Sequence, residues 1–335
     1  MNHKGAKITE KSKKFNTETQ RLRNTEKSII RKMLFGVVIV AFVLFGFALA
    51  YDTAPLTVNW KAEGEWIVFY CGIFTDSESR SNLYIVRPDG SELQQITNNR
   101  IVAKSPSWSP DGTWIVFHDG THVYRIRPNG KDITTIVDLP TLQEIVDVVW
   151  SPNGQWIAYN TIGLLSGQEL WLIQPDGTNK TRIAQSEDMS FLRLSWSNNS
   201  QQIAFANIKS GTATGVYSVD IQTHAIIQTL PHIGAIQHLE WLPNNDEMLV
   251  EALPNRALYR LNLDTLQLTP IELDSFYSSP SLSPDGTQIS YSGIDETTNQ
   301  SAQILVTDFV EGTTRSITDI EDCLPTHPRW YIFSR

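Results

Sequence analysis

The chain has 335 residues, of which 41% are hydrophobic and 19% charged, so it can bury a large core and is not a disordered or fibrous protein as a whole. Residues 1–32 carry ten Lys and Arg against three Asp and Glu, a balance of +7, and residues 33–335 carry 17 basic and 33 acidic residues, a balance of -16. An acidic body repels phosphate backbones, so nucleic acid is not an expected partner.

An apolar segment follows the basic N-terminal residues. Residues 33–51, MLFGVVIVAFVLFGFALAY, contain no charge and as a helix would span about 28 Å at ~1.5 Å per residue. The preceding Lys and Arg predict a cytoplasmic N-terminus by the positive-inside rule. The sequence thus predicts a basic cytoplasmic tail (1–32), a transmembrane signal anchor (33–51), a short linker (52–55) and an extracytoplasmic body. Cleavage after Ala50, as in a signal peptide, is the alternative.

Six copies of one motif organise the rest of the chain. They read NWKAEGEWIVFY at Trp60, SWSPDGTWIVFH at Trp108, VWSPNGQWIAYN at Trp150, SWSNNSQQIAFA at Trp196, EWLPNNDEMLVE at Trp241 and SLSPDGTQISYS at Leu282. Their separations of 48, 42, 46, 45 and 41 residues match the period of four-stranded propeller blades.

A second signature follows each copy, as in NLYIVRPDG at Asn82 and ELWLIQPDG at Glu169, and a short fourth apolar stretch follows that. We therefore expect four strands per blade, A to D, with Ser-Pro-Asp-Gly in the A–B turn. The ten Trp fall in three repeat columns, with Trp330 in the first, which favours packing between blades over a carbohydrate platform.

The pattern P-x-W-S-P-D-G-x-x-I-x-F followed by L-Y-x-x-x-P-D-G resembles the WD-like repeat of TolB-type six-bladed propellers, and also the propeller of prolyl oligopeptidase and dipeptidyl peptidase relatives. The resemblance covers residues 56–335 and implies an all-β, six-bladed β-propeller of four-stranded blades, here preceded by one N-terminal transmembrane helix. The α/β domain of TolB is replaced by a tail and anchor, so a TolB role in the Tol-Pal system is not implied. Repeats four and five also lack the Asp-Gly turn.

Catalytic and cofactor motifs are missing from the sequence. It contains no G-x-S-x-G elbow, P-loop, G-x-G-x-x-G, H-E-x-x-H or EF-hand pattern, so no catalytic, cofactor-binding or metal-binding residue and no cofactor is assigned. His118-Asp119-Gly120-Thr121-His122 could hold a metal, but Asp-Gly is also an ordinary hairpin turn. His232, His238 and His327 fit loop or strand-end positions.

The A-strand approaches, AKSPSW, IVDVVW, LRLSW, IQHLEW and SSPSL, carry few ionisable groups, whereas a catalytic propeller should gather several around its axis. This favours a non-catalytic protein-binding or scaffolding module in the cell envelope, with another membrane or envelope protein as partner. The alternatives are a lyase or hydrolase that binds a small ligand or sugar in the central funnel, and a sensor that signals through its tail.

The two cysteines suggest a covalent closure of the ring. Cys71 ends strand B of blade one, and Cys323 precedes a terminal strand at residues 328–330 that would return beside blade one. Outside the cytoplasm the two thiols are predicted to form a disulfide, with two free thiols as the alternative.

One face is expected to bind the partner. The B–C connections at residues 71–81, 160–168, 207–214 and 293–301 look long and irregular, and variable loops on a rigid rim usually carry binding. Ser79, Leu165 and Thr212 are the predicted partner-binding positions on this loop face. Because strand A of blade one would begin near Leu56, only a short linker from the anchor, the loop face is expected to look toward the membrane.

Overall fold

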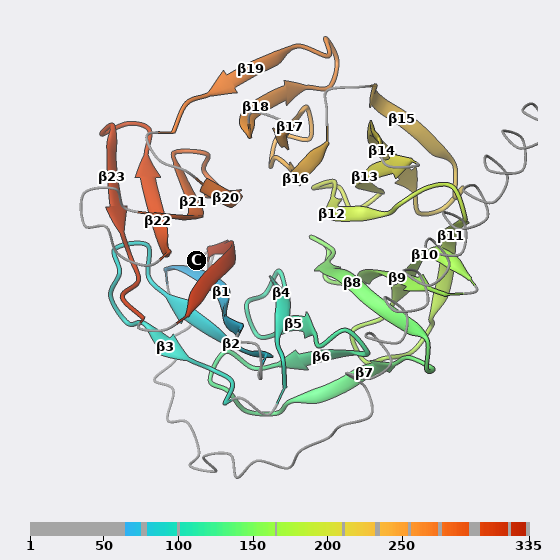
Figure 1. The fold of residues 1–335 in the computed structure, drawn as a ribbon, viewed down its shortest axis with the longest axis horizontal. Helices are drawn as coiled ribbons and strands as arrows, with labels where there is room; N and C mark the ends of the chain where they lie inside the picture. Colours follow the sequence, from blue (N-terminus) through green and yellow to red (C-terminus); the bar gives the residue numbers. More distant parts are fainter. Residues whose placement is uncertain are drawn as a thin grey trace, which may run out of the picture. The chain divides into compact units, whose positions relative to one another are not determined.

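The computed structural model describes residues 64–74, 79–98, 101–164, 166–209, 212–231, 235–253, 256–273, 277–294, 302–320 and 323–332. These residues form six antiparallel sheets of four strands each, arranged as blades around an axis (Figure 1). The predicted all-β, six-bladed propeller is therefore confirmed. The predicted anchor, residues 33–51, lies outside the described residues, and within them no helix has the length and hydrophobicity to cross a bilayer.

In each blade strand A lies next to the axis and strand D at the rim, as the labels β4, β8, β12, β16 and β20 around the centre of Figure 1 show. From A to D, blade one contains β24 (Leu324–Ile332), β1 (Glu65–Phe74), β2 (Ser79–Val86) and β3 (Gln94–Gln95). Blade two contains β4 (Lys104–Trp108), β5 (Ile115–His118), β6 (His122–Ile126) and β7 (Thr134–Asp138), and blade three contains β8 (Gln143–Trp150), β9 (Ile157–Gly163), β10 (Gly167–Ile173) and β11 (Thr181–Ser186).

The last three blades follow the same order. Blade four contains β12 (Leu192–Trp196), β13 (Gln202–Lys209), β14 (Thr212–Asp220) and β15 (Ile226–Pro231). Blade five contains β16 (Ile236–Trp241), β17 (Glu247–Ala252), β18 (Ala257–Asn262) and β19 (Leu268–Ile271), and blade six contains β20 (Tyr277–Leu282), β21 (Gln288–Gly293), β22 (Gln303–Asp308) and β23 (Thr313–Ser316).

The C-terminal strand closes the ring. β24 pairs with β1 in antiparallel register and thereby fills the inner position of blade one, which we expected residues near Leu56 to supply. That expectation is wrong because Trp60 and Trp330 both carry the inner-strand signature, and a closed ring has room for one of them next to β1. The described chain therefore reaches blade one at Glu65, opposite Ile332, on the face of the A–B turns.

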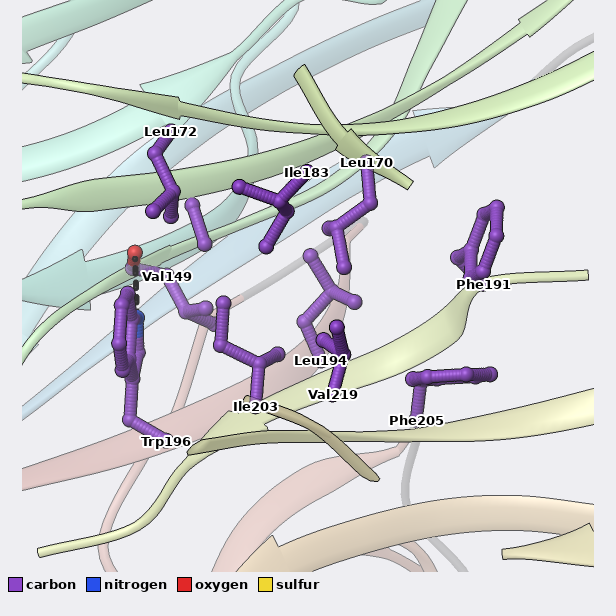
Figure 2. Packing of buried hydrophobic residues seen from close by; sticks show 11 residues of the cluster. Val149, Leu170, Leu172, Ile183, Phe191, Leu194, Trp196, Ile203, Phe205 and Val219 are labelled. Carbon is purple, nitrogen blue, oxygen red and sulfur yellow. Dashed lines mark hydrogen bonds between the residues drawn. The ribbon is translucent and has the colours of Figure 1, made fainter. Parts of the chain in front are cut away.

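Apolar layers between neighbouring blades form the core. Figure 2 shows the layer between blades three and four, where Leu170 and Ile183 of one blade face Leu194 and Ile203 of the next. The Trp196 indole N–H also donates a hydrogen bond of 3.4 Å across this layer, to the main-chain carbonyl of Val149. The packing role predicted for the first Trp column is confirmed, since its described members in blades one to four are at most 9% exposed.

The A–B turns keep one backbone conformation although their sequences differ. Gly112, Gly154 and Gly286 take positive φ of 64°, 73° and 75° three residues before the first apolar residue of strand B. Ser200 and Asn245 stand at the same position in blades four and five, with φ of 58° and 62°. The loss of Asp-Gly in those repeats has therefore not changed the turn, although a side chain in this region costs about 1 kcal/mol.

The predicted long B–C loops are mostly wrong. In blade one, β1 ends at Phe74 and β2 begins at Ser79. In blade four, β13 and β14 are separated only by residues 210–211, and in blade three the turn takes residues 164–166. Polar residues in these segments, such as Ser81, Asn82 and Asn207, pair across antiparallel ladders beyond the apolar part of each strand. Of the four, residues 294–302 remain a long connection.

Candidate functional site

The inner strands bring a set of polar residues to the axis of the propeller. In every blade the residue three positions before the Trp or Leu that ends the inner-strand motif belongs to this set, which we call the axial ring. Its members are Ser105, Asp147, Arg193, His238, Ser279 and His327.

A β-bulge sits at or beside each member of the axial ring. All six inner strands contain one residue more than strand B opposite them at this point. In four blades the ring residue itself has positive φ: 47° at Ser105, 58° at Arg193, 52° at Ser279 and 53° at His327. Non-glycine residues pay roughly 1–2 kcal/mol for this conformation, and such strain is typical of functional sites. The same strain in four blades fixes the direction of the ring residues.

Two further charged residues stand one position before the terminal Trp. Glu240 of β16 lies 3.6 Å from Arg329 of β24 and 3.5 Å from the Nε2 atom of His238, and its other oxygen accepts a hydrogen bond of 3.3 Å from the Ser281 hydroxyl. A carboxylate from blade five thus joins an arginine from blade one and a hydroxyl from blade six.

The axial ring, Glu240 and Arg329 together are called the channel residues. Two of them are histidines that are held neutral. Burial lowers the pKa of His238 to about 4, and Arg329 and Arg193 oppose protonation further, although Glu240 favours it. The pKa of His327 falls well below its usual value through burial and through the charges of Arg193 and Arg329. His327 also stacks on Tyr70, with ring centroids 5.2 Å apart.

Arg193 differs from the other charged groups of the channel. Among the described residues its guanidinium has no hydrogen-bond or ion-pair partner. Asp147 is affected by both Arg193 and Arg329, but burial raises the pKa of this carboxyl, and its oxygens already accept the main-chain N–H groups of Val148 and Leu194 at 2.9 and 3.0 Å. The positive charge of Arg193 is therefore less well neutralised than that of Arg329.

A cavity of about 320 Å³ lies at the A–B turn side and reaches two of these residues. Glu240 and Arg329 line it, together with Ser107 and Ser195. The remaining wall is largely aromatic and proline-rich, and contains Trp108, Trp150, Trp196, Trp241, Trp330, Tyr331, Pro110, Pro152 and Pro284. Apolar walls with a few convergent polar groups are typical of ligand sites.

The axial ring corrects one sequence interpretation. We expected few ionisable groups on the inner strands, yet the channel gathers Asp147, Arg193, His238, Glu240 and Arg329. They come from four of the six blades, and apart from His238 and Glu240 they lie more than 40 residues from one another along the chain, so no short motif contains them all. The available signal was the Trp column: the third position before each Trp contains Asp147, Arg193 and His238, and the position directly before it contains Glu240 and Arg329.

The structure joins Cys71 and Cys323 by a disulfide, with Cα atoms 5.6 Å apart. Cys71 lies in β1 opposite Pro325 of β24, and Cys323 immediately precedes β24. The bond therefore lies beside the start of the closing strand, on the loop face.

The predicted partner-binding positions are placed only in part. Ser79 begins β2 and Thr212 begins β14, while Leu165 lies outside the described residues. Beside residue 165, however, three apolar side chains are exposed on the loop face of blade three: Leu142, Ile162 and Leu164, at 60%, 42% and 79%. The hypothesis that this face binds a partner stays a prediction. Its argument from loop length fails for three of the four connections, and its argument from the position of strand A fails as well.

The histidines of residues 118–122 have separate surroundings. His118 is buried in β5, and neither of its ring nitrogens has a hydrogen-bond partner in the structure. His122 contacts Asp119 at 3.1 Å and Asp138 at 3.3 Å. Among the residues that the structure describes, no group of three or more His, Cys, Asp or Glu is arranged to hold a metal ion.

Comparison with known proteins supports the propeller assignment. No protein-family model matches the chain. A TolB homologue from Chlorobium luteolum is 30% identical over 146 residues, which is 42% of this chain and about a third (32%) of the relative's length. The crystal structure of TolB from Acinetobacter baumannii superposes with a TM-score of 0.65 and 15% identity, over 80% of this chain and 66% of that one. An oligogalacturonate lyase in complex with manganese has a TM-score of 0.54 and 14% identity, over 72% and 71%. At such identities the two structures show a shared fold.

Proposed function

The chain is a member of the TolB-type β-propeller family, and we propose that it works as a membrane-anchored, extracytoplasmic and non-catalytic binding module of the cell envelope. Residues 33–51 would be the anchor, with the basic residues 1–32 in the cytoplasm. The partner would be an envelope or membrane protein. The match to the TolB homologue covers about a third (32%) of that relative, so a Tol-Pal role lies outside this proposal.

The observation that carries the proposal is the aromatic cavity at the A–B turn end of the channel. Trp241, Tyr331 and the edges of four buried tryptophans line it, and Glu240 and Arg329 add polar contacts. Trp, Tyr and Arg are enriched in protein-binding sites. The described chain also begins on this face, at Gly64 and Glu65. We therefore place the partner on the A–B turn face in this proposal and retain the loop face as the competing position.

Site-specific photo-crosslinking in intact cells tests this choice. Crosslinkers at Asn153 and Asp285 stand next to cavity-lining prolines and should capture one common envelope protein. Asn129, in a C–D turn near the rim, is the control on the same face. Crosslinkers at Ser79, Leu165 and Thr212 should give no product. Capture from the latter three positions alone would move the working surface to the loop face and contradict the proposal.

The ionisable groups of the channel favour one second candidate, an enzyme acting on a small ligand. Burial lowers the pKa of His238 to about 4 and that of His327 well below its usual value, so both present unprotonated ring nitrogens, as weak bases, to a ligand at neutral pH. The full chain incubated with an envelope extract should then generate product masses that His238→Gln abolishes. In a binding module no product appears, and H238Q changes only affinity.

A further inference from the structure

The electrostatics of the channel centre on Arg193. Burial is the main influence on five groups around it: it raises the pKa of Tyr70, Asp147 and Glu251 and lowers the pKa of His238 and His327. In all five the charge of Arg193 acts toward a lower pKa, and these groups belong to blades one, three and five. Arg193 itself belongs to β12 of blade four. Groups from several blades thus lie within range of one guanidinium near the axis.

Arg193 combines the backbone strain that it shares with three other residues of the axial ring with a guanidinium that no described residue pairs. Arg193 adopts φ of 58°, in a bulge that adds a residue to β12. Its guanidinium presents five N–H donors, and no described residue accepts from them. Holding an unpaired cation in a strained, partly buried position is unfavourable unless a ligand uses it.

A second arginine is within reach of the same ligand. The charges of Arg193 and Arg329 both act on Asp147, His238 and His327, and Asp147 accepts a hydrogen bond of 3.0 Å from the main-chain N–H of Leu194, the residue after Arg193. Arg329 lines the cavity, and so do Leu194 and Ser195, which directly follow Arg193 in β12. Glu240 occupies one side of Arg329 at 3.6 Å.

We propose that Arg193 and Arg329 form an anion-binding site at the inner end of the cavity, which takes a carboxylate or phosphate group of a ligand that enters from the A–B turn face. The planar fork of arginine matches both groups in bidentate hydrogen bonds. The aromatic wall of the cavity would hold an apolar or aromatic portion attached to the anion. The inference rests on the proposed function, because the cavity is the same one.

Fluorescence titration of the full chain in detergent tests the site, since five of the ten Trp line the cavity. The probes are phenylacetate, its neutral analogue 2-phenylacetamide, and inorganic phosphate, at constant ionic strength. We expect a saturable response to phenylacetate or phosphate and at least tenfold weaker binding of the amide. The more tightly bound anion identifies the class.

Arg193→Gln and Arg329→Gln should each weaken the anion at least tenfold. Arg260→Gln is the matched control, because Arg260 of β18 is a surface arginine that lies 3.6 Å from Glu247. This variant should bind the anion as the wild type does. Arg193→Lys keeps the charge without the fork and should lose threefold to tenfold. If circular dichroism shows that R193Q does not fold, the anion affinities of R193K and R329Q test the site instead.

Two results would overturn the proposal: no saturable anion binding by the wild type, or equal affinity in the wild type, R193Q and R329Q. Crosslinking from Asp285 separates this failure from that of the proposed function. If the partner is still captured while no anion binds, the arginine site is wrong and the binding module stands. If anions bind as expected and no partner is captured from the A–B turn face, the proposed function fails.

Discussion

Trp330 in β24 lies opposite Ile67 in β1, in the register that joins Trp108 to Ile115 in blade two. The Trp330 indole N–H also donates a hydrogen bond of 2.9 Å to the carbonyl of Ser281 in blade six. The C-terminal strand therefore completes blade one and connects it to its neighbour in the same way as an ordinary inner strand.

Replacing Trp330 should destabilise the propeller far more than replacing Trp60. Trp330 is 9% exposed, and truncating a buried Trp to Ala costs about 3–5 kcal/mol of unfolding free energy. Trp60 precedes Trp66 at the spacing that separates Trp108 from Trp114 in blade two. The inner position of blade one, however, is occupied by β24. Urea unfolding of W330A and W60A, followed by circular dichroism, measures the difference. A larger loss in W60A would mean that residues 56–60 supply the inner strand.

The disulfide is predicted to be present in the exported protein and to stabilise the ring. A crosslink that closes a loop of 252 residues contributes about 5 kcal/mol in the chain-entropy model. Thiol labelling of the denatured full chain should give no label before reduction and two after it. Cys71→Ser should lower the melting temperature as much as reduction does. Two labels without reduction would contradict the predicted bond.

How far the sequence predicted this molecule depends on the kind of signal. Strand number and blade packing repeat six times, so the Trp columns and turns were sufficient to predict them. The closure of blade one was mispredicted because Trp60 and Trp330 carry the same local signature. Loop length was overestimated because the ends of the hairpins carry polar residues.

The channel was hidden from the sequence for a different reason. Arg193 and His238 belong to strands of different blades, and in the sequence only their place three residues before a repeat Trp marks them. Only the bulges of the inner strands, together with the closure of the ring, bring such residues to one place. Backbone features of this kind have no residue signature, since Ser, Arg and His all adopt positive φ there.

Stability should fall steeply in acid because of the buried histidines. The pKa of His118 is lowered to about 3 and that of His238 to about 4, mainly by burial, so the unfolded state binds more protons below its own pKa of about 6.5. Above about pH 6.5 both histidines are neutral in the folded and in the unfolded state, so their burial then causes no loss of stability through protonation. As pH falls from 6.5 toward 4, each costs about 1.4 kcal/mol per pH unit.

Urea unfolding at pH 7 and pH 5 measures this effect in the wild type, H118Q and H238Q. Each substitution should reduce the loss of stability between the two pH values by about 2 kcal/mol. His224→Gln is the control, because His224 is exposed in a turn. The same pH dependence in all four proteins would show that the buried histidines are not responsible.

The membrane anchor predicts a defined topology. Protease added to intact spheroplasts should digest the propeller and spare an epitope placed after Met1, because the basic tail keeps the N-terminus inside. Permeabilised cells, in which the epitope is lost, are the control. Protection of the propeller would contradict the orientation, and a mature protein that begins at Tyr51 would establish cleavage after Ala50.

Amide hydrogen exchange tests most directly the claim that the cavity is the binding site. The full chain is compared with and without the partner obtained by crosslinking. If the cavity is the binding site, the partner should protect the A–B turns at residues 109–113, 151–155 and 283–287, which surround the cavity. Protection confined to the loop face at residues 119–121, 142 and 164, with unchanged exchange at the A–B turns, would contradict it.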